Sequence, residues 1–458
     1  MPKNILTIAS FFAAFWLIFL LLQNETIHKI TFGKISDTWV DSVDGKKLVN
    51  APFKKLTNEN YVQWDGVHYH TIKNTGYDIE KANGDYIFAF FPLYPLIWNI
   101  SGLPPIGMIF INYLLFGIAL LILYKIFGTN KSLLRNTPLL IAFSIPTLVV
   151  FLIPYTESTF LLAGAIGLYG LTKKKYWIYF VGFFLCALTR PTYTFLMLSL
   201  IGAEVFFLLG HKQILSTIKS TFFKLLPLGL GTLTVSIVHK SYSGGGFFKF
   251  VEVQKYWDHV LSIPHGIRDW SHEGFGMSLG IIFIIAIPLF AILLLLFYNQ
   301  LVGSIKKSMV RIFDNTPNNY IQVLSIFYIV GIFLFILLFQ GGSLNGLSRY
   351  VLCTPFFFSL LFFSFNYISK IDASYRFFFF ITLSLFSVFS LGLIDYSTQW
   401  NFSDTGMFLT IALFFFWLFQ DLSQSKIYKV GLYSTVFVNV VWTAYLFNTY
   451  ISNGWIFT

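Results

Sequence analysis

Charged residues are scarce in this chain. They make up 11% of its 458 residues, whereas a soluble globular domain carries about 25%. Hydrophobic residues account for 56%, and the mean hydropathy is +0.70. An ordinary soluble protein is thereby excluded. The composition predicts an all-α polytopic membrane protein, folded as a single integral domain over residues 1–458.

Cysteine is nearly absent. Cys186 and Cys353 both lie in apolar runs, which favours buried, small hydrophobic side chains. A disulfide framework and a cysteine metal site are excluded. The chain also lacks an internal repeat. No small-x-small cleavage site follows the apolar run 5–22, so this run is predicted to be a retained anchor helix.

Long apolar runs are abundant. Since about 20 apolar residues in a helix cross a bilayer, we expect about thirteen transmembrane helices. They are placed at 5–22, 106–124, 138–154, 157–172, 176–189, 193–210, 225–241, 278–299, 320–339, 350–366, 377–393, 405–420 and 430–450.

The connecting charges orient these spans. If the N-terminus is cytoplasmic, the inner segments hold 17 Lys and Arg against three Asp, the positive-inside pattern. The basic excess therefore reflects topology, and no nucleic-acid partner is implied. Two large segments, 23–87 and 242–277, fall on the non-cytoplasmic face, and 278–458 adds C-terminal helices.

The first outer segment carries the candidate catalytic residue, Asp65, in Trp64-Asp65-Gly66-Val67-His68-Tyr69-His70. A carboxylate at a membrane surface can take a proton from an attacking hydroxyl. Trp64 and Tyr69 offer stacking faces for a sugar ring. The alternative is an aspartate that caps an interfacial helix.

A metal site is the less favoured interpretation of His68 and His70. Side chains two residues apart share a face on a strand but not on a helix. The stretch from Tyr61 to Tyr77 is more typical of helical or irregular structure. We therefore expect solvated or hydrogen-bonding histidines, with ligation of a divalent ion as the less favoured alternative.

Prolines interrupt the next aromatic run. Pro92 and Pro95 in 90–96 rule out a regular transmembrane helix, because each proline removes an amide donor. Broken backbone at membrane depth must pack on protein or line a cavity. The segment either walls the site below the first outer segment or is a plain kink.

Three charged residues lie at the outer ends of predicted spans: Glu157, Arg190 and Arg349. Charges near the hydrocarbon boundary are costly and often mark function. Arginine binds phosphate oxygens with two parallel hydrogen bonds, which suits a lipid-phosphate donor. Snorkelling or a structural arginine–glutamate pair is the alternative.

Taken in order, these motifs resemble those of the PIG-V-type mannosyltransferases, and prokaryotic members in particular. The matching segments are Trp64-Asp65-Gly66-Val67-His68-Tyr69, Gly76-Tyr77, Phe91-Pro92-Leu93-Tyr94-Pro95, Tyr155-Thr156-Glu157-Ser158, Arg190-Pro191-Thr192, Gln254-x-x-Trp257 and Ser348-Arg349-Tyr350. One departure is the Pro-Thr-Tyr after Arg190, where the family pattern has a glycine.

The resemblance implies a GT-C glycosyltransferase, with the bundle and the large first outer loop of that class. It implies inverting transfer of a hexose, mannose first, from a polyprenyl phosphate to a lipid-linked or glycan acceptor. No organic cofactor is needed, because such a donor already carries its activated sugar and a phosphate leaving group. Asp65 would be catalytic, and the donor- and acceptor-binding residues would be Trp64, His68, Tyr69, Glu157, Arg190, Gln254, Arg349 and Tyr350.

Membrane lipids would surround the chain, in the plasma membrane of a prokaryote or the endoplasmic reticulum of a eukaryote, with the site on the non-cytoplasmic face. The alternative from another class is a transporter or flippase of a lipid-linked sugar. Transporters tend to have internal repeats and ionisable groups near the midplane. A third option is a non-catalytic subunit of a glycosyltransferase complex.

The charge pattern makes a topological prediction. Residues 23–87 and 242–277 should lie on the same, non-cytoplasmic side, because the inner loops hold the basic excess. Single cysteines at Ser42 and Ser243 should both react with a membrane-impermeant thiol reagent in intact cells. Labelling at one site and not at the other contradicts the topology.

Overall fold

A computed structural model gives the structure of the chain. It describes residues 2–27, 30, 42–43, 46–47, 56–128, 137–211, 214–242, 244–257, 261, 316–339, 346–366, 368–394, 402–454 and 456. The predicted span 278–299 and most of 258–277 lie outside these residues, as do 341–345 and 395–401.

The described structure is almost entirely helical. Five helices are long and apolar enough to cross a membrane, which marks an integral, multi-pass membrane protein. They are α1 (Pro2–Leu22), α6 (Pro105–Phe127), α11 (Ile214–Lys240), α16 (Pro317–Phe339) and α21 (Lys426–Ile451). The only described strands are β1 (Ser42–Val43) and β2 (Lys46–Lys47), a two-residue antiparallel pair.

Shorter helices complete the described chain. The α-helices are α3 (Asp65–Thr75), α4 (Ile79–Ala82), α5 (Leu93–Ser101), α7 (Thr137–Ala142), α8 (Glu157–Thr172), α9 (Tyr176–Thr189), α10 (Tyr193–His211), α12 (Lys249–Glu252), α17 (Leu347–Leu352), α18 (Pro355–Ser364), α19 (Ala373–Ile394) and α20 (Phe402–Leu418). The 3₁₀ helices are η1 (Asn58–Tyr61), η2 (Asp85–Ala89), η3 (Leu148–Leu152), η4 (Val253–Trp257), η8 (Ile368–Lys370) and η9 (Gln420–Gln424).

Most of the expected helices are present. Those expected at 157–172 and 176–189 coincide with α8 and α9, and seven others agree within a few residues at each end. The span placed at 225–241 begins too late, because α11 starts at Ile214 and takes in Lys219 and Lys224.

Two expected spans are wrong as continuous helices. The stretch 138–154 divides into α7 and η3 around Pro146, and 350–366 divides into α17 and α18. Pro355 lies at the first position of α18, where its missing amide costs no helical hydrogen bond, and the Thr354 hydroxyl caps the helix by accepting from the Phe357 amide at 3.3 Å. All residues from 137 to 160 are buried, as broken backbone at membrane depth requires.

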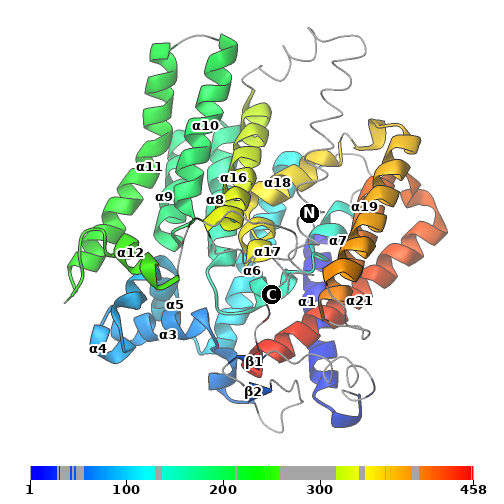
Figure 1. Ribbon diagram of the computed structural model, residues 1–458, viewed down its shortest axis with the longest axis horizontal. Coiled ribbons are helices and arrows are strands. Elements are labelled where there is room, and N and C mark those ends of the chain that lie inside the picture. Colours follow the sequence, from blue (N-terminus) through cyan, green and yellow to red (C-terminus); the bar gives the residue numbers. More distant parts are fainter. Residues whose placement is uncertain are drawn as a thin grey trace.

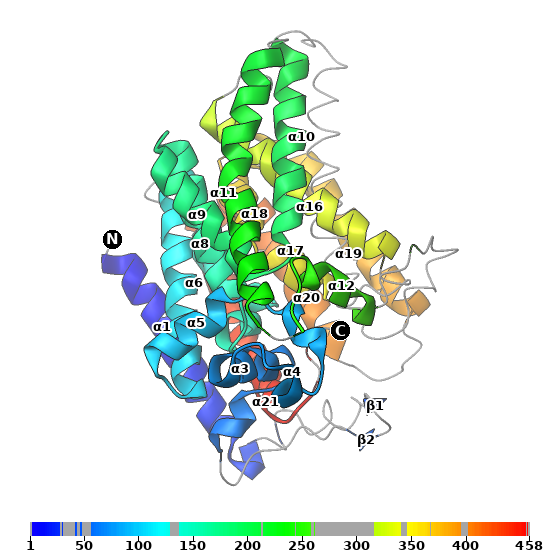
Figure 2. The ribbon, with the colours of Figure 1, turned by 90° about the vertical axis from the view of Figure 1, so that its left-hand side faces the viewer.

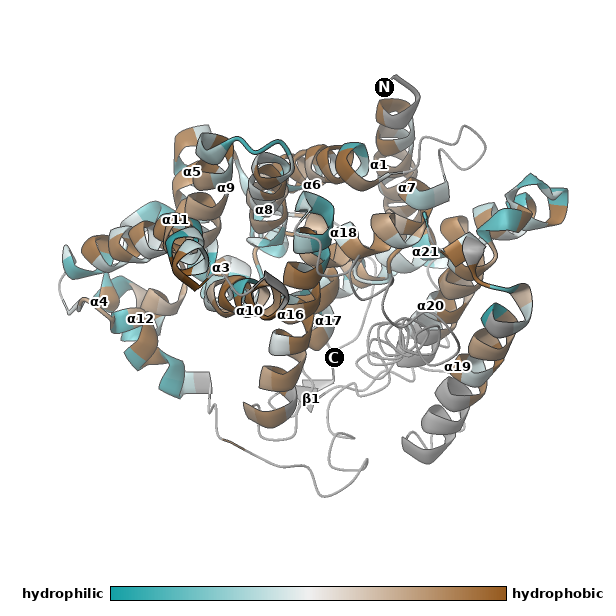
Figure 3. Cartoon of the chain, turned by 90° about the horizontal axis from the view of Figure 1, so that it is seen from above, coloured by the Kyte–Doolittle hydropathy of each residue, from teal (hydrophilic) through white to brown (hydrophobic). Residues whose placement is uncertain are grey.

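The helices form one bundle with a smaller group of elements at one end (Figure 1). Helix α8 packs between α6 and α9, α9 against α11, and α10 against α11 and α16. On the other side, α1 and α20 pack on α21. Helices α3, α4 and α12 gather near the lower ends of α9 and α11 (Figure 2). Hydrophilic colour is concentrated there and at loop ends, while the long helices are mainly hydrophobic (Figure 3).

The two segments predicted to share one face contact each other. Lys249 pairs with Asp85 at 2.9 Å, and the Tyr256 hydroxyl donates to Asp85 at 2.7 Å. These bonds hold the pKa of Asp85 below its ordinary value. Residues 249–256 are thereby fastened to the segment that carries Asp65.

Glycines bring α8 and α9 into close contact. A Cβ on Gly182 would lie 2.2 Å from the backbone nitrogen of Gly167. Small residues at a helix–helix contact let the backbones approach, a common way of packing in membranes. The contact matters for the site, because the N-terminus of α8 and the C-terminus of α9 hold Glu157 and Arg190.

Substitution of Gly182 tests this contact. Gly182→Ala should lower the stability by about 1–3 kcal/mol, since the backbones must separate. Gly229→Ala is the matched control, because a Cβ there meets nothing within 4 Å. Thermal unfolding in detergent should show a lower midpoint for the first variant alone. Equal midpoints for the two variants would contradict the close contact.

Candidate functional site

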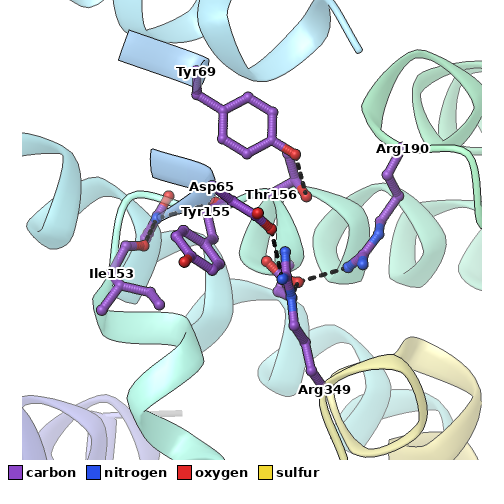
Figure 4. Close-up of polar contacts among 9 residues, drawn as sticks. Asp65, Tyr69, Ile153, Tyr155, Thr156, Arg190 and Arg349 are labelled. Carbon is purple, nitrogen blue, oxygen red and sulfur yellow. Dashed lines mark hydrogen bonds and ion pairs between the residues drawn. The ribbon is translucent and has the colours of Figure 1, made fainter. Parts of the chain in front are cut away.

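Four charged side chains from distant parts of the chain form one network. Glu157 Oε1 accepts from Arg190 Nη1 at 2.8 Å and from Arg349 Nε. Arg349 Nη1 also donates to Asp65 Oδ2 at 2.6 Å. Figure 4 shows Arg349 directed at Asp65, with Arg190 approaching from the other side. The order of contacts is Arg190–Glu157–Arg349–Asp65.

Local structure explains where the inner pair comes from. Glu157 is the first residue of α8, and Arg190 directly follows α9. The two helices are connected by three lysines and pack along each other, so the start of one meets the end of the other. An acid at a helix N-terminus and a base at a C-terminus are each stabilised by the helix dipole.

Arg349 joins this pair to the first predicted outer segment. It lies in the short helix α17, and Asp65 is the first residue of α3. The Arg349 guanidinium carbon lies 4.6 Å from the ring centre of Tyr155, and that of Arg190 lies 5.0 Å from Tyr350. Aromatic faces therefore support both arginines.

Exposure differs sharply along the network. The side chain of Glu157 is 0% exposed, Arg349 7% and Arg190 8%, but Asp65 is 30% exposed. Asp65 Oδ2 accepts from Arg349, and no described contact occupies its Oδ1. Asp65 is thus the most exposed member of the network.

Glu157 Oε2 and Asn112 Oδ1 are among the buried acceptor atoms of the described residues that have no hydrogen-bond partner. Such atoms are rare and often lie at functional sites. Asn112 also donates to the backbone carbonyls of Ile153 and, at 3.3 Å, of Tyr155. It thereby fixes the broken backbone that leads to Glu157. Asn112 is not among the predicted site residues, although a lone amide in the apolar run 106–124 is a usable indication.

The residues around Asp65 do not all have the expected environment. Tyr69 is buried, with its hydroxyl 3.5 Å from that of Thr156 and its ring against Phe90 and Tyr94. Its ring has no open face for stacking on a sugar. The half-buried Trp64 donates through its indole to the Gly454 carbonyl at 3.2 Å.

The histidines point to different surroundings, as expected for a helix. The ring centre of His68 lies 4.4 Å from that of Phe90, while the ring centre of His70 lies 5.1 Å from that of Trp98. Burial lowers the pKa of His68 below its ordinary value, against the opposing effect of Asp65. No group of three His, Cys, Asp or Glu is arranged for a metal within the described chain.

The remaining predicted residues divide into two groups. Tyr350 lies beside both arginines of the network. Gln254 instead donates to the Phe250 carbonyl at 3.0 Å, and no described contact joins it to Asp65.

Around Pro92, the chain forms only the short helix α5, and Tyr94 accepts from Asn112 at 3.1 Å. This segment packs against α3.

Comparison with known proteins adds no assignment: no protein-family model, curated protein or solved structure matches this chain.

Removal of the central acid should destabilise the protein. Glu157→Gln leaves two buried arginines without their shared carboxylate, which should cost about 3–5 kcal/mol of stability. Glu252→Gln is the control. Glu252 pairs with Lys249, but its side chain is 62% exposed, and such exposed pairs contribute little to stability. Thermal unfolding of both variants measures the difference. A Glu157→Gln midpoint equal to that of the control would show that Glu157 does not hold the network.

Proposed function

We propose that the chain is a membrane glycosyltransferase of the GT-C class, similar to the PIG-V-type mannosyltransferases. It transfers a hexose, in the first place mannose, from a polyprenyl phosphate to a hydroxyl of a lipid-linked or glycan acceptor. The site faces the non-cytoplasmic side. One observation carries the proposal: motifs spread from Asp65 to Arg349 meet through direct contacts in a single charged network.

In the proposed reaction, the acceptor oxygen attacks the anomeric carbon from the side opposite the lipid phosphate. The new carbon–oxygen bond forms as the bond to the phosphate oxygen breaks, which inverts the anomeric configuration. Asp65 accepts the proton of the attacking hydroxyl. Its exposure supports this role, as does an Oδ1 that makes no contact with any described residue.

In this proposal, the arginines bind the phosphate leaving group. Two arginines face two carboxylates, so the network is neutral as it stands. Among the described contacts, Arg190 donates only through Nη1, which leaves its other nitrogens for phosphate oxygens. Charge-assisted contacts to the departing phosphate stabilise the charge that grows there. We assign the primary phosphate contact to Arg190, and to Arg349 the additional task of orienting Asp65.

Neutralisation of Asp65 tests the catalytic role. Asp65→Asn keeps an oxygen that accepts from Arg349 but removes the base, so turnover should fall about 10²–10⁴-fold. Donor binding should change little, because the arginines remain. Purified protein, polyprenyl-phosphate mannose and a lipid acceptor provide the assay. Glu59→Gln, the same chemical change at an exposed position of the same segment, is the control and should retain full activity.

The outcomes separate the candidate functions. Wild-type turnover by Asp65→Asn would remove Asp65 from the chemistry. A wild-type protein that carries the intact donor between leaflets, and releases no polyprenyl phosphate, would instead be the flippase.

A further inference from the structure

The C-terminal helix reaches back to the segment that carries Asp65. The hydroxyl of Tyr450, in the last turn of α21, accepts from the Gln63 backbone amide at 3.1 Å. The same hydroxyl donates to the Gln63 carbonyl at 3.0 Å. Just beyond the helix, the Gly454 carbonyl accepts from the Trp64 indole. Two adjacent residues before Asp65 are therefore held by residues almost 400 positions away in the sequence.

The backbone at this point needs such support. Trp64 has φ 52° and ψ −127°, a conformation that a bulky residue rarely adopts. Strain of this kind costs about 1–3 kcal/mol and persists only where the surroundings impose it. The next residue is Asp65, so the Trp64 conformation sets the direction in which α3 and the carboxylate begin.

Gly66 leaves room for the tyrosine hydroxyl. A Cβ at this position would lie 3.0 Å from the Tyr450 hydroxyl oxygen and 3.3 Å from Pro154 Cγ. Any larger residue would press on the hydroxyl that holds Gln63. The glycine of the Trp-Asp-Gly motif thus has a physical role in this contact.

Tyr450 also contacts Tyr155, the aromatic residue that packs against Arg349. Its ring lies edge-on to Tyr155, with 5.9 Å between ring centres, and Tyr155 lies under the Arg349 guanidinium. Tyr450 is 0% exposed, so its side chain is enclosed on all sides by protein. A single side chain from α21 touches the supports of both Asp65 and Arg349.

We infer that Tyr450 is a positioning residue for Asp65: its hydroxyl fixes the Gln63–Trp64 backbone and thereby aims the Asp65 carboxylate. The C-terminal helices thus contribute to the site. This inference rests on the proposed transferase function for its kinetic consequence, whereas the backbone contact itself can be tested without activity.

The experiment compares Tyr450→Phe with Tyr428→Phe. Tyr428 lies on the same helix, roughly 33 Å away at about 1.5 Å per residue, and its buried hydroxyl donates to the Phe416 carbonyl at 2.6 Å. Both variants lose one hydroxyl and keep the ring. Thermal unfolding in detergent checks that both are folded.

Hydrogen exchange of a peptide covering residues 61–67 reports the contact directly. Exchange should become roughly fivefold faster or more in Tyr450→Phe, because the Gln63 amide loses its acceptor, and should stay unchanged in Tyr428→Phe. Unchanged exchange in Tyr450→Phe would overturn the inference, whatever the activity of the protein.

Kinetics test the positioning of Asp65. Tyr450→Phe should lower kcat about 10- to 100-fold with little change in KM, since a misplaced base slows chemistry more than binding. In an Asp65→Asn background, Tyr450→Phe should cause no further loss. An equal loss in both backgrounds, or a kcat equal to that of Tyr428→Phe, would contradict positioning through Asp65. If the wild type transfers no sugar, the proposed function fails, and exchange alone decides the backbone contact.

Discussion

The site depends on one carboxylate oxygen. Glu157 Oε1 accepts from Arg190 and Arg349 at the buried start of α8. Two buried arginines would repel each other without it, and an unpaired buried charge costs several kcal/mol. The glycine contact of α8 with α9, and the Asn112 bonds to the backbone before Glu157, place that oxygen. The surrounding helices therefore hold the four charged side chains of the network in a fixed arrangement.

The exposure of the side chains in the network increases from Glu157, inside the protein, to Asp65. Glu157 is fully buried, and Asp65 is the most exposed member. A substrate would therefore reach Asp65 first. Arg349 makes one contact inward and one outward, so it links the fixed interior to the segment that carries the proposed base. The strained residue Trp64 directly precedes Asp65, and its indole donates to the Gly454 carbonyl, which follows the C-terminal helix.

Much of the helical framework follows from local hydrophobic pattern, which is why α8 and α9 were predicted to the residue. The candidate network was also predictable in its members, because Asp65, Glu157, Arg190 and Arg349 are rare charges beside apolar runs. Their pairing was not, since nothing in a linear pattern says that Arg349 bridges two acids. The breaks near Pro146 and Pro355 were missed by counting apolar residues alone. Tyr450 could not be found at all, because one buried tyrosine among 25 has no local pattern to distinguish it.

The central claim is that this network transfers a sugar from a lipid phosphate. Its most direct test is the stoichiometry and stereochemistry of the reaction of purified wild-type protein with an anomerically pure polyprenyl-phosphate mannose. The account predicts one polyprenyl phosphate released for each mannose transferred, and a product of inverted anomeric configuration. A product with retained configuration, or donor that stays intact in the presence of acceptor, would contradict it.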